Sequence, residues 1–202
     1  KTKAIMPVSL YGQPADMDII QDIADKHNLK VIIDGAQSLG STYKGKTDSN
    51  LVDISTTSFF PAKPLGCYGD GGAVFTNNDE YAKTIKMMRV HGQNKRYHHK
   101  YIGMGGRLDT IQAAVLLAKL PHYPQELADR QQVAQRYTDT LSGSLQTPVI
   151  KPNRSSAWAQ YTLRVNNRDV LQAKLKDNGI PTAVHYPLPL HLQECFQYLN
   201  YK

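Results

Sequence analysis

The sequence has few cysteines and no long apolar run. Its two cysteines, Cys67 and Cys195, cannot build the disulfide framework of a small secreted domain. Its longest uninterrupted apolar segment, AAVLLA at 113–118, is far shorter than the roughly 20 residues of a membrane-spanning helix. The N-terminal stretch KTKAIMPVSLYGQ lacks the apolar core of a secretory signal. These absences exclude a disulfide scaffold and a transmembrane helix, and predict a cytoplasmic protein that makes no membrane contact.

The composition is that of a folded globular chain. Of its 202 residues, 41% are hydrophobic and 20% are charged, which separates it from disordered sequences. It contains no internal repeat and no low-complexity tract. The chain begins with Lys1 instead of Met, and its first residues already have the pattern of a strand. We therefore expect it to be a piece of a longer protein.

Compact apolar segments alternate with helical patterns along the chain, which predicts an α/β fold with a mostly parallel sheet. Asp16 is expected to cap the first helix. Proline, serine and asparagine at 146–156 predict a linker between a large domain at 1–145 and part of a small α/β domain at 157–202. Strands are predicted at 4–8, 29–34, 53–60, 71–76, 159–165 and 181–186, and helices at 16–27, 77–92, 107–120, 124–141 and 168–178.

Much of the net charge of +7 lies in one run, which we call the basic segment, 89–100. Such a run suits a polyanion or a phosphorylated small molecule, and a solvated basic loop is the alternative. Because no nucleic-acid-binding motif accompanies it, no nucleic-acid partner is predicted, and no metal site is predicted either. The charged and titratable residues of the segment are Arg89, His91, Lys95, Arg96, His98, His99 and Lys100.

Lys63 is the only lysine or arginine from residue 47 to residue 82. It precedes Pro64 in the apolar, glycine-rich stretch SFFPAKPLGCYGDGGA at 58–73. Apolar surroundings disfavour the charged form of an amine, and a neutral amine can attack a carbonyl group. The stretch therefore favours a reactive lysine, and an exposed loop lysine is the alternative.

Asp34 ends the predicted strand LKVIID and precedes a Gly-Ala turn. Ligands of open α/β sheets bind at the carboxyl ends of the strands, and Lys63 follows the next predicted strand. Together the two residues supply what pyridoxal phosphate requires, because a lysine can hold its aldehyde while a carboxylate keeps its ring nitrogen protonated. A plain turn or cap is the alternative for Asp34.

Four segments together resemble the nucleotide-sugar aminotransferases of the DegT/DnrJ/StrS family. They are VIIDGAQSLGSTYKGK, SFFPAKPLGCYGDGGAVFTN, IGMGGRLDTIQAAVL and VHYPLPLH, in family-like order and spacing over nearly the whole chain. The resemblance implies the fold of type I pyridoxal-phosphate transferases, with a mostly parallel sheet flanked by helices. It also implies pyridoxal 5'-phosphate as the cofactor.

The resemblance assigns cofactor roles position by position. Lys63 would be the Schiff-base lysine and the catalytic acid and base. Asp34 would pair with the ring nitrogen, and Gln37 would lie against the ring near its phenolic oxygen. Ser58 would contact the phosphate of the cofactor.

The resemblance also implies a substrate class. SFFPAKPLGCYGDGGA most resembles enzymes that make 2,3-diamino uronic acids for O-antigen and other surface polysaccharides, which act on a UDP-2-acetamido-3-keto-sugar acid with glutamate as amino donor. His185, Tyr186 and Arg107 would bind substrate, and a strand-to-turn aromatic pair is the alternative for the first two. Family sites are built between two subunits, which implies a homodimer.

The sequence departs from the family pattern at several points, including Ile33, where many relatives have an acidic residue before the aspartate. Gly105 stands where many relatives have an asparagine that reaches the phosphate in the neighbouring subunit, so this residue is not expected to make that contact. Family members also carry further residues before and after this chain, including a loop that binds the phosphate. Two alternatives follow: a truncated, catalytically inactive fragment, or a non-catalytic phosphate- or polyanion-binding module that uses the basic segment.

Overall fold

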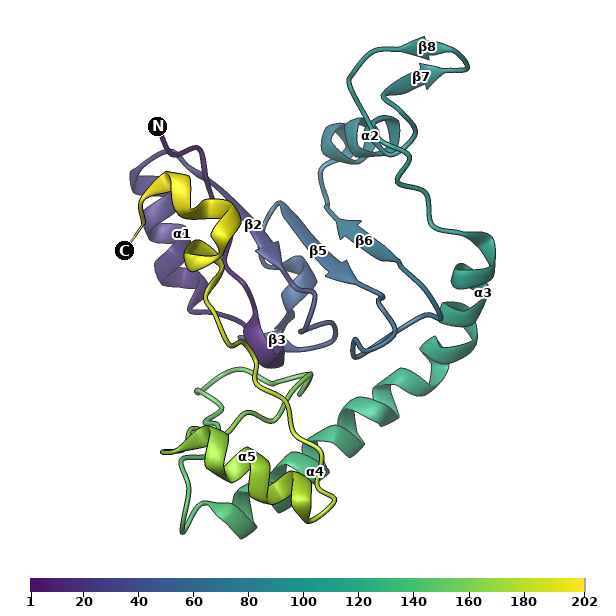
Figure 1. Cartoon of the computed structure of the whole chain (residues 1–202). Helices are drawn as coiled ribbons and strands as arrows, with labels where there is room; N and C mark the ends of the chain where they lie inside the picture. The colour runs from purple at the N-terminus through teal and green to yellow at the C-terminus, as the bar shows by residue number, and fades with distance from the viewer. Residues whose placement is uncertain (202) are drawn as a thin grey trace. The chain divides into compact units, whose positions relative to one another are not determined.

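The computed structural model describes residues 1–201. Its central sheet has four strands in the order β1-β2-β5-β6, and Figure 1 shows β2, β5 and β6 side by side. β1, β2 and β5 are parallel, and β6 is antiparallel to β5. The mostly parallel sheet is therefore confirmed. The strand bounds are Ala4–Ile5 for β1, Lys30–Asp34 for β2, Ile54–Ser58 for β5 and Gly72–Phe75 for β6.

The first hydrophobic cluster joins helix α1, Met17–Lys26, to β2. Val31 and Ile33 alternate with less buried residues along β2, as a strand requires when one face is fully covered. Met17 and Ala24 lie one above the other on α1 and pack against these strand residues. This contact fixes the position of β2, whose last residue is Asp34.

The second cluster lies where the chain enters the long helical segment. It brings Leu116 of α3 and Tyr123 of α4 against Leu65 and Cys67 in the loop after β5. The Tyr123 hydroxyl donates to the Leu39 carbonyl at 2.7 Å, and burial raises the pKa of Tyr123 to about 12. α3 spans Thr110–Lys119, the 3-10 helix η3 spans Leu120–His122 and α4 spans Tyr123–Leu141.

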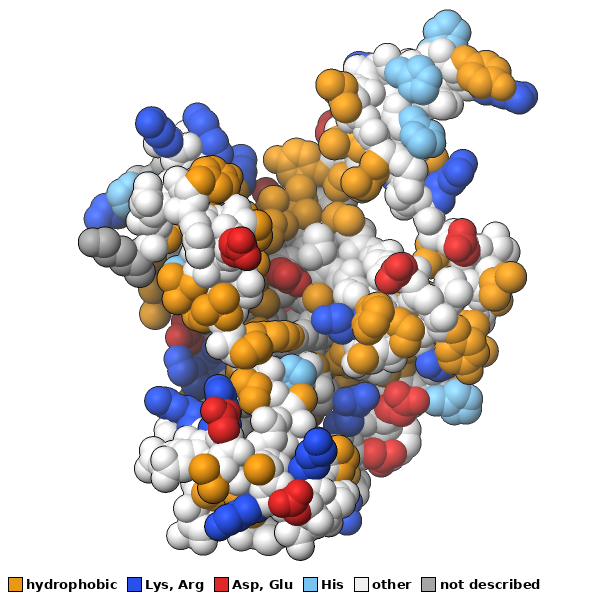
Figure 2. All heavy atoms as spheres, in the orientation of Figure 1, with side chains coloured by type: hydrophobic (Ala, Val, Ile, Leu, Met, Phe, Trp, Pro, Cys, Tyr) orange, Lys and Arg blue, Asp and Glu red, His pale blue; other side chains and the backbone are white. Residues whose placement is uncertain are grey.

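Helix α2, Asp79–Met88, lies within the helix predicted at 77–92 and begins after a capping asparagine. The Asn78 side chain accepts hydrogen bonds from Glu80 N and Tyr81 N. The following basic segment forms a hairpin of β7, Gln93–Lys95, and β8, His98–His99, which the periodicity did not indicate. Figure 2 shows histidine and basic side chains gathered on this hairpin.

Short elements complete the first part of the chain. β3 and β4 form a second small hairpin, and two 3-10 helices flank the central strands. Their bounds are Leu10–Gly12 for η1, Thr42–Tyr43 for β3, Lys46–Thr47 for β4 and Asp48–Asn50 for η2.

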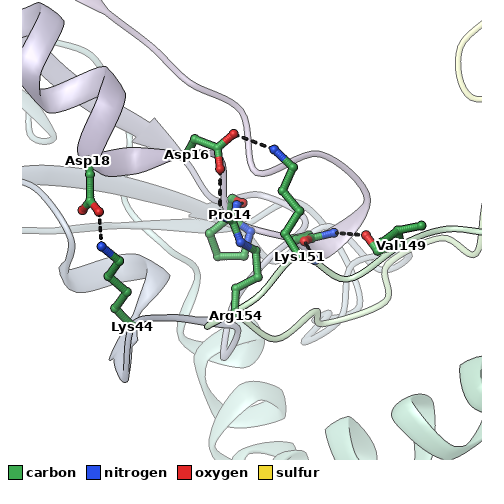
Figure 3. Close-up of polar contacts among 8 residues, drawn as sticks. Pro14, Asp16, Asp18, Lys44, Val149, Lys151 and Arg154 are labelled. Atoms are coloured by element: carbon green, nitrogen blue, oxygen red, sulfur yellow. Dashed lines mark hydrogen bonds and ion pairs between the residues drawn. The ribbon is translucent and has the colours of Figure 1, made fainter.

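Residues 149–159, which we call the return segment, pack against the loop between β1 and α1 (Figure 3). Asp16 occupies the N-cap position of α1 but makes no side-chain cap hydrogen bond, so the predicted capping role is wrong. Its carboxylate instead binds Lys151 Nζ at 2.6 Å and Arg154 Nη2 at 2.7 Å. Hydrogen bonds from Lys151 and then Arg154 lower the pKa of Asp16. In the same view Lys44 pairs with Asp18.

The backbone of the return segment also contacts this loop. Ala157 N donates to Gly12 O at 2.9 Å, and Ala159 N donates to Tyr11 O at 3.0 Å. Gly12 has φ +114°, and a Cβ added there would lie 2.6 Å from Trp158 N. Glycine is therefore required for the two backbones to approach this closely.

The chain divides into two compact units, 1–140 with 148–161, and 141–147 with the residues from 162 onward. Most of the predicted linker therefore belongs to the first unit, and the assignment of a large and a small domain stays a prediction. Among the residues that the structure describes, no helix is long and apolar enough to span a membrane.

In the second unit, helix α5 at Arg168–Asp177 confirms the predicted helix. The strands predicted at 159–165 and 181–186 are wrong, because within the described chain Arg164 forms only an isolated bridge with Gln146. An apolar, β-prone segment becomes a strand only when a neighbour satisfies its N–H and C=O groups. The 3-10 helices η4, Leu190–Leu192, and η5, Glu194–Leu199, end the unit.

Candidate active site

Asp34 is held at the carboxyl end of β2 by its main chain. Its N–H donates to Pro7 O at 3.0 Å, and its carbonyl accepts from Ser9 N at 3.0 Å. Its Oδ1 accepts from Ala36 N at 3.0 Å, while Oδ2 accepts no hydrogen bond from the residues described. The backbone that carries the half-buried carboxylate is therefore held in place, and one carboxylate oxygen is available to a ligand.

The turn that follows places Gln37. Its side chain is buried, with 5% exposed, and Oε1 accepts from Tyr11 N at 2.5 Å. Gly35 fits against β5, since a Cβ there would lie 2.9 Å from Thr56 O. Thr57 Oγ1 donates to the Gly35 carbonyl at 3.2 Å. The turn is thus hydrogen-bonded both to the loop after β1, through Tyr11, and to β5, through Thr57.

Ser58 ends β5 and begins the loop that carries Lys63. Its Oγ accepts from Phe60 N at 3.2 Å, and Lys63 N donates to Phe60 O at 2.8 Å. The far side of the loop is tied back, because Cys67 N donates to Phe59 O at 2.8 Å. The loop is therefore a closed turn that fixes the Lys63 backbone.

Gly66 is packed tightly in this loop. A Cβ there would lie 2.5 Å from Pro61 O, so Gly66→Ala must push the turn apart. We expect this change to lower the free energy of unfolding by about 2 kcal/mol, as overpacking does. Thermal and urea unfolding measure it. Gly143→Ala is the matched control, since a Cβ there meets nothing within 4 Å; equal stability of the two variants would contradict the expectation.

The parallel pairing of β2 and β5 brings the four predicted cofactor residues to one sheet edge. Asp34 is in register with Thr56, so Ser58 and the Lys63 loop continue beyond the same edge as Gln37. Lys63 is half-buried, and within the described chain its Nζ makes no hydrogen bond or ion pair. The apolar surroundings predicted for it are only partial, since Phe60 is 49% exposed.

Of the three predicted substrate-binding residues, Arg107 lies in the first unit and the other two lie in the second. Arg107 is exposed ahead of α3, which begins at Thr110 after Asp109 at the N-cap position. His185 and Tyr186 belong to the second unit, where their rings meet edge to face with centroids 5.3 Å apart. Their substrate-binding roles stay predictions.

Sequence reasoning missed Asp48, a buried carboxylate beside the Asp34 turn. It is 1% exposed, accepts from Ser9 Oγ at 3.1 Å and also accepts from Ser38 Oγ. Burial raises the pKa of Asp48, hydrogen bonds from Ser38 and Ser9 oppose the rise, and the Asp34 carboxylate adds to it. In the sequence, TDSN has the composition of an ordinary polar turn.

Comparison with known proteins identifies the family of this chain. A family model for the DegT/DnrJ/EryC1/StrS aminotransferase family matches residues 1–202. A curated relative from Pseudomonas aeruginosa, UDP-2-acetamido-2-deoxy-3-oxo-D-glucuronate aminotransferase, is 56% identical over 194 residues, which are 96% of this chain and 54% of the relative.

Solved structures share the fold. An aminotransferase of the same family from Brucella abortus is 43% identical with a TM-score of 0.94, covering 97% of this chain and 53% of that one. NtdA from Bacillus subtilis, solved with bound cofactor PMP, is 32% identical with a TM-score of 0.86, over 96% of this chain and 46% of that one. This chain spans about half the length of these relatives. It belongs to the DegT/DnrJ/EryC1/StrS aminotransferase family.

Proposed function

We propose that the full-length protein is a pyridoxal-phosphate-dependent aminotransferase that transfers an amino group to a nucleotide-linked keto-sugar. The observation that carries this proposal is the placement of Asp34 at the carboxyl end of β2 and of Lys63 just past that of the adjacent parallel strand β5. Ligands of α/β sheets bind at such an edge. Membership of an aminotransferase family and the PMP bound to NtdA support the same conclusion.

The residues at this edge fit the cofactor by their chemistry. Lys63 offers an amine that makes no hydrogen bond or ion pair in the described chain. Asp34 offers Oδ2, a carboxylate oxygen that likewise accepts no hydrogen bond there. The Ser58 hydroxyl accepts from Phe60 N and can still donate its own hydrogen to a phosphate oxygen. Buried Gln37 supplies a fixed amide beside them. Amine, carboxylate and hydroxyl match the aldehyde, ring nitrogen and phosphate of pyridoxal phosphate.

Each residue then has a defined task. When bound, the cofactor supplies an electron sink for the pair left on carbon as a C–H bond breaks. Lys63 Nζ removes the proton from the α-carbon of the amino donor and later delivers a proton to the sugar carbon. Asp34 would hold the protonated ring nitrogen through its carboxylate and stabilise the positive charge there. The donor takes a carbonyl oxygen from water and leaves as a keto acid, its nitrogen passes to the sugar carbon, and the sugar carbonyl oxygen leaves as water.

The substrate proposed is a UDP-2-acetamido-3-keto-sugar acid, with glutamate as amino donor, in the synthesis of O-antigen or another surface polysaccharide. The named activity of the Pseudomonas aeruginosa relative supports this choice. The net charge of +7 also suits a substrate that carries a diphosphate and a carboxylate. Arg107, His185 and Tyr186 are proposed as its binding residues.

We further propose that the full-length protein works as a homodimer in the cytoplasm. The outward face of α3 supports association, because Ile111 is 75% exposed and Leu117 is 70% exposed. Light scattering at micromolar concentration measures the mass. A monomer under those conditions would remove this part of the proposal.

The test of function uses the full-length protein with pyridoxal phosphate, glutamate and the UDP-3-keto-sugar acid. We expect release of 2-oxoglutarate in step with the amino-sugar product, followed by mass spectrometry. Borohydride reduction followed by peptide mapping should place the cofactor on Lys63. Turnover is also measured with the matched UDP-3-keto-sugar that lacks the carboxylate. Equal turnover of both sugars would support amination of keto-sugars in general but not a preference for the sugar acid. Cofactor on another lysine, or on none, would overturn the proposal.

A further inference from the structure

Asp48 joins the loop after β1 to the turn that follows Asp34. Ser9 binds the Asp34 carbonyl through its N–H, and its hydroxyl donates to Asp48 Oδ1 at 3.1 Å. Ser38 binds the Gly35 carbonyl through its N–H at 3.1 Å, and its hydroxyl donates to Asp48 Oδ2. One carboxylate therefore accepts from Ser9, which binds the Asp34 carbonyl, and from Ser38, which closes the turn that carries Gln37.

The surroundings of Asp48 leave it little freedom. The carboxylate and both serine partners are at most 1% exposed. A Cβ at Gly35 would lie 3.3 Å from Asp48 Oδ2, so the turn rests directly on the carboxylate. The Asp48 backbone is fixed as well, because its N–H donates to Ser41 O at 2.9 Å. Keeping a carboxylate in such a place is costly unless its hydrogen bonds are satisfied.

From these contacts we propose that Asp48 is a positioning residue, which holds the Asp34–Ser38 turn in the conformation that binds the cofactor. The inference rests on the proposed function for the identity of the ligand. Asp48 touches neither ligand nor reacting atoms in this role. Its effect passes through Ser9 and Ser38 to the backbone from which Asp34 and Gln37 project.

Removing the acceptor should loosen the turn. In Asp48→Ala two buried hydroxyls lose their partner, so the turn samples other conformations. The apparent Kd then rises as the competent fraction falls. We expect a rise of roughly 10- to 100-fold for Asp48→Ala. Asp48→Asn keeps the shape and one acceptor oxygen, and should recover much of the loss. Asp53→Ala and Asp53→Asn are the matched controls, since Asp53 is an exposed aspartate in the loop before β5.

The experiment measures pyridoxal phosphate binding to the full-length variants by absorbance, and hydrogen exchange of residues 34–41 without cofactor by mass spectrometry. Weaker binding and faster exchange in the Asp48 variants, with the Asp53 variants unchanged, support the inference. A lower melting temperature with unchanged Kd and exchange means a purely structural role and overturns it. If Asp48→Ala does not fold, Asp48→Asn is compared with Asp53→Asn instead. The same two measurements, the Kd for pyridoxal phosphate and the hydrogen exchange of residues 34–41, then decide.

The two proposals fail in different ways. Absence of pyridoxal phosphate binding by the unaltered protein defeats the proposed function. In that case hydrogen exchange still decides whether Asp48 holds the turn, since faster exchange confined to residues 34–41 in Asp48→Asn supports it and unchanged exchange overturns it. Normal binding by the unaltered protein and by all variants defeats only the role of Asp48.

Discussion

Lys63→Ala is expected to lower turnover of the full-length protein by at least about 10⁴-fold. The substitution removes the amine that anchors the cofactor and the base that moves both protons. The remaining contacts from Asp34, Gln37 and Ser58 can still hold the cofactor noncovalently. Steady-state formation of the amino-sugar measures the loss, and borohydride reduction should no longer label the peptide.

Lys46→Ala is the matched control for this variant, because Lys46 is an exposed lysine on the β3–β4 hairpin, outside the proposed site. It should keep both turnover and borohydride labelling. Added methylamine should restore part of the activity of Lys63→Ala, since a free amine can replace the missing base. Labelling of the Lys63→Ala protein at a different lysine would show that the anchor has been misplaced.

Asp34→Asn is expected to slow turnover on the order of 10²- to 10⁴-fold while the cofactor remains attached to Lys63. Asparagine keeps the shape of the side chain but loses the charge. A carboxylate beside a ring nitrogen shifts its pKa upward by a few units, at about 1.4 kcal/mol per unit. Without it the ring nitrogen loses its proton and the electron sink weakens.

Two measurements separate this effect from a loss of binding. Borohydride labelling of Lys63 should be unchanged in Asp34→Asn, while the visible absorbance of the bound cofactor should shift. Asp53→Asn, at an exposed position, should match the unaltered protein in both. Near-normal turnover in Asp34→Asn would make Asp34 an ordinary strand-end residue and contradict the placement of the cofactor.

The sequence could predict those parts of the fold that depend on residues close together in the chain. β2 reads as an apolar strand that ends at Asp34, and α2 begins at an asparagine whose side chain does cap it. Lys63 could be found because basic residues are absent around it over a long stretch. The placement of Asp34 and Lys63 at one sheet edge follows from the general geometry of parallel strands.

The parts that could not be predicted depend on distant residues. Asp16 has the side chain of a good cap, but Arg154 and Lys151 arrive from the return segment and bind its carboxylate. Residues 159–165 have strand-like composition but lack a neighbouring strand in the described structure. Asp48 reads as a turn residue, because its serine partners come from two other loops.

The return segment has a consequence for the order of events during protein synthesis. The ribosome releases the N-terminal residues first, so β1, β2 and β5 can pair early. Ala159, which binds the Tyr11 carbonyl, emerges much later, and Tyr11 N in turn binds Gln37. Closing so long a loop costs chain entropy and slows this step. In the nascent chain the sheet therefore forms before the bonds that run from Ala159 through Tyr11 to Gln37 are complete. The chain can bind its ligand only after the return segment has been translated.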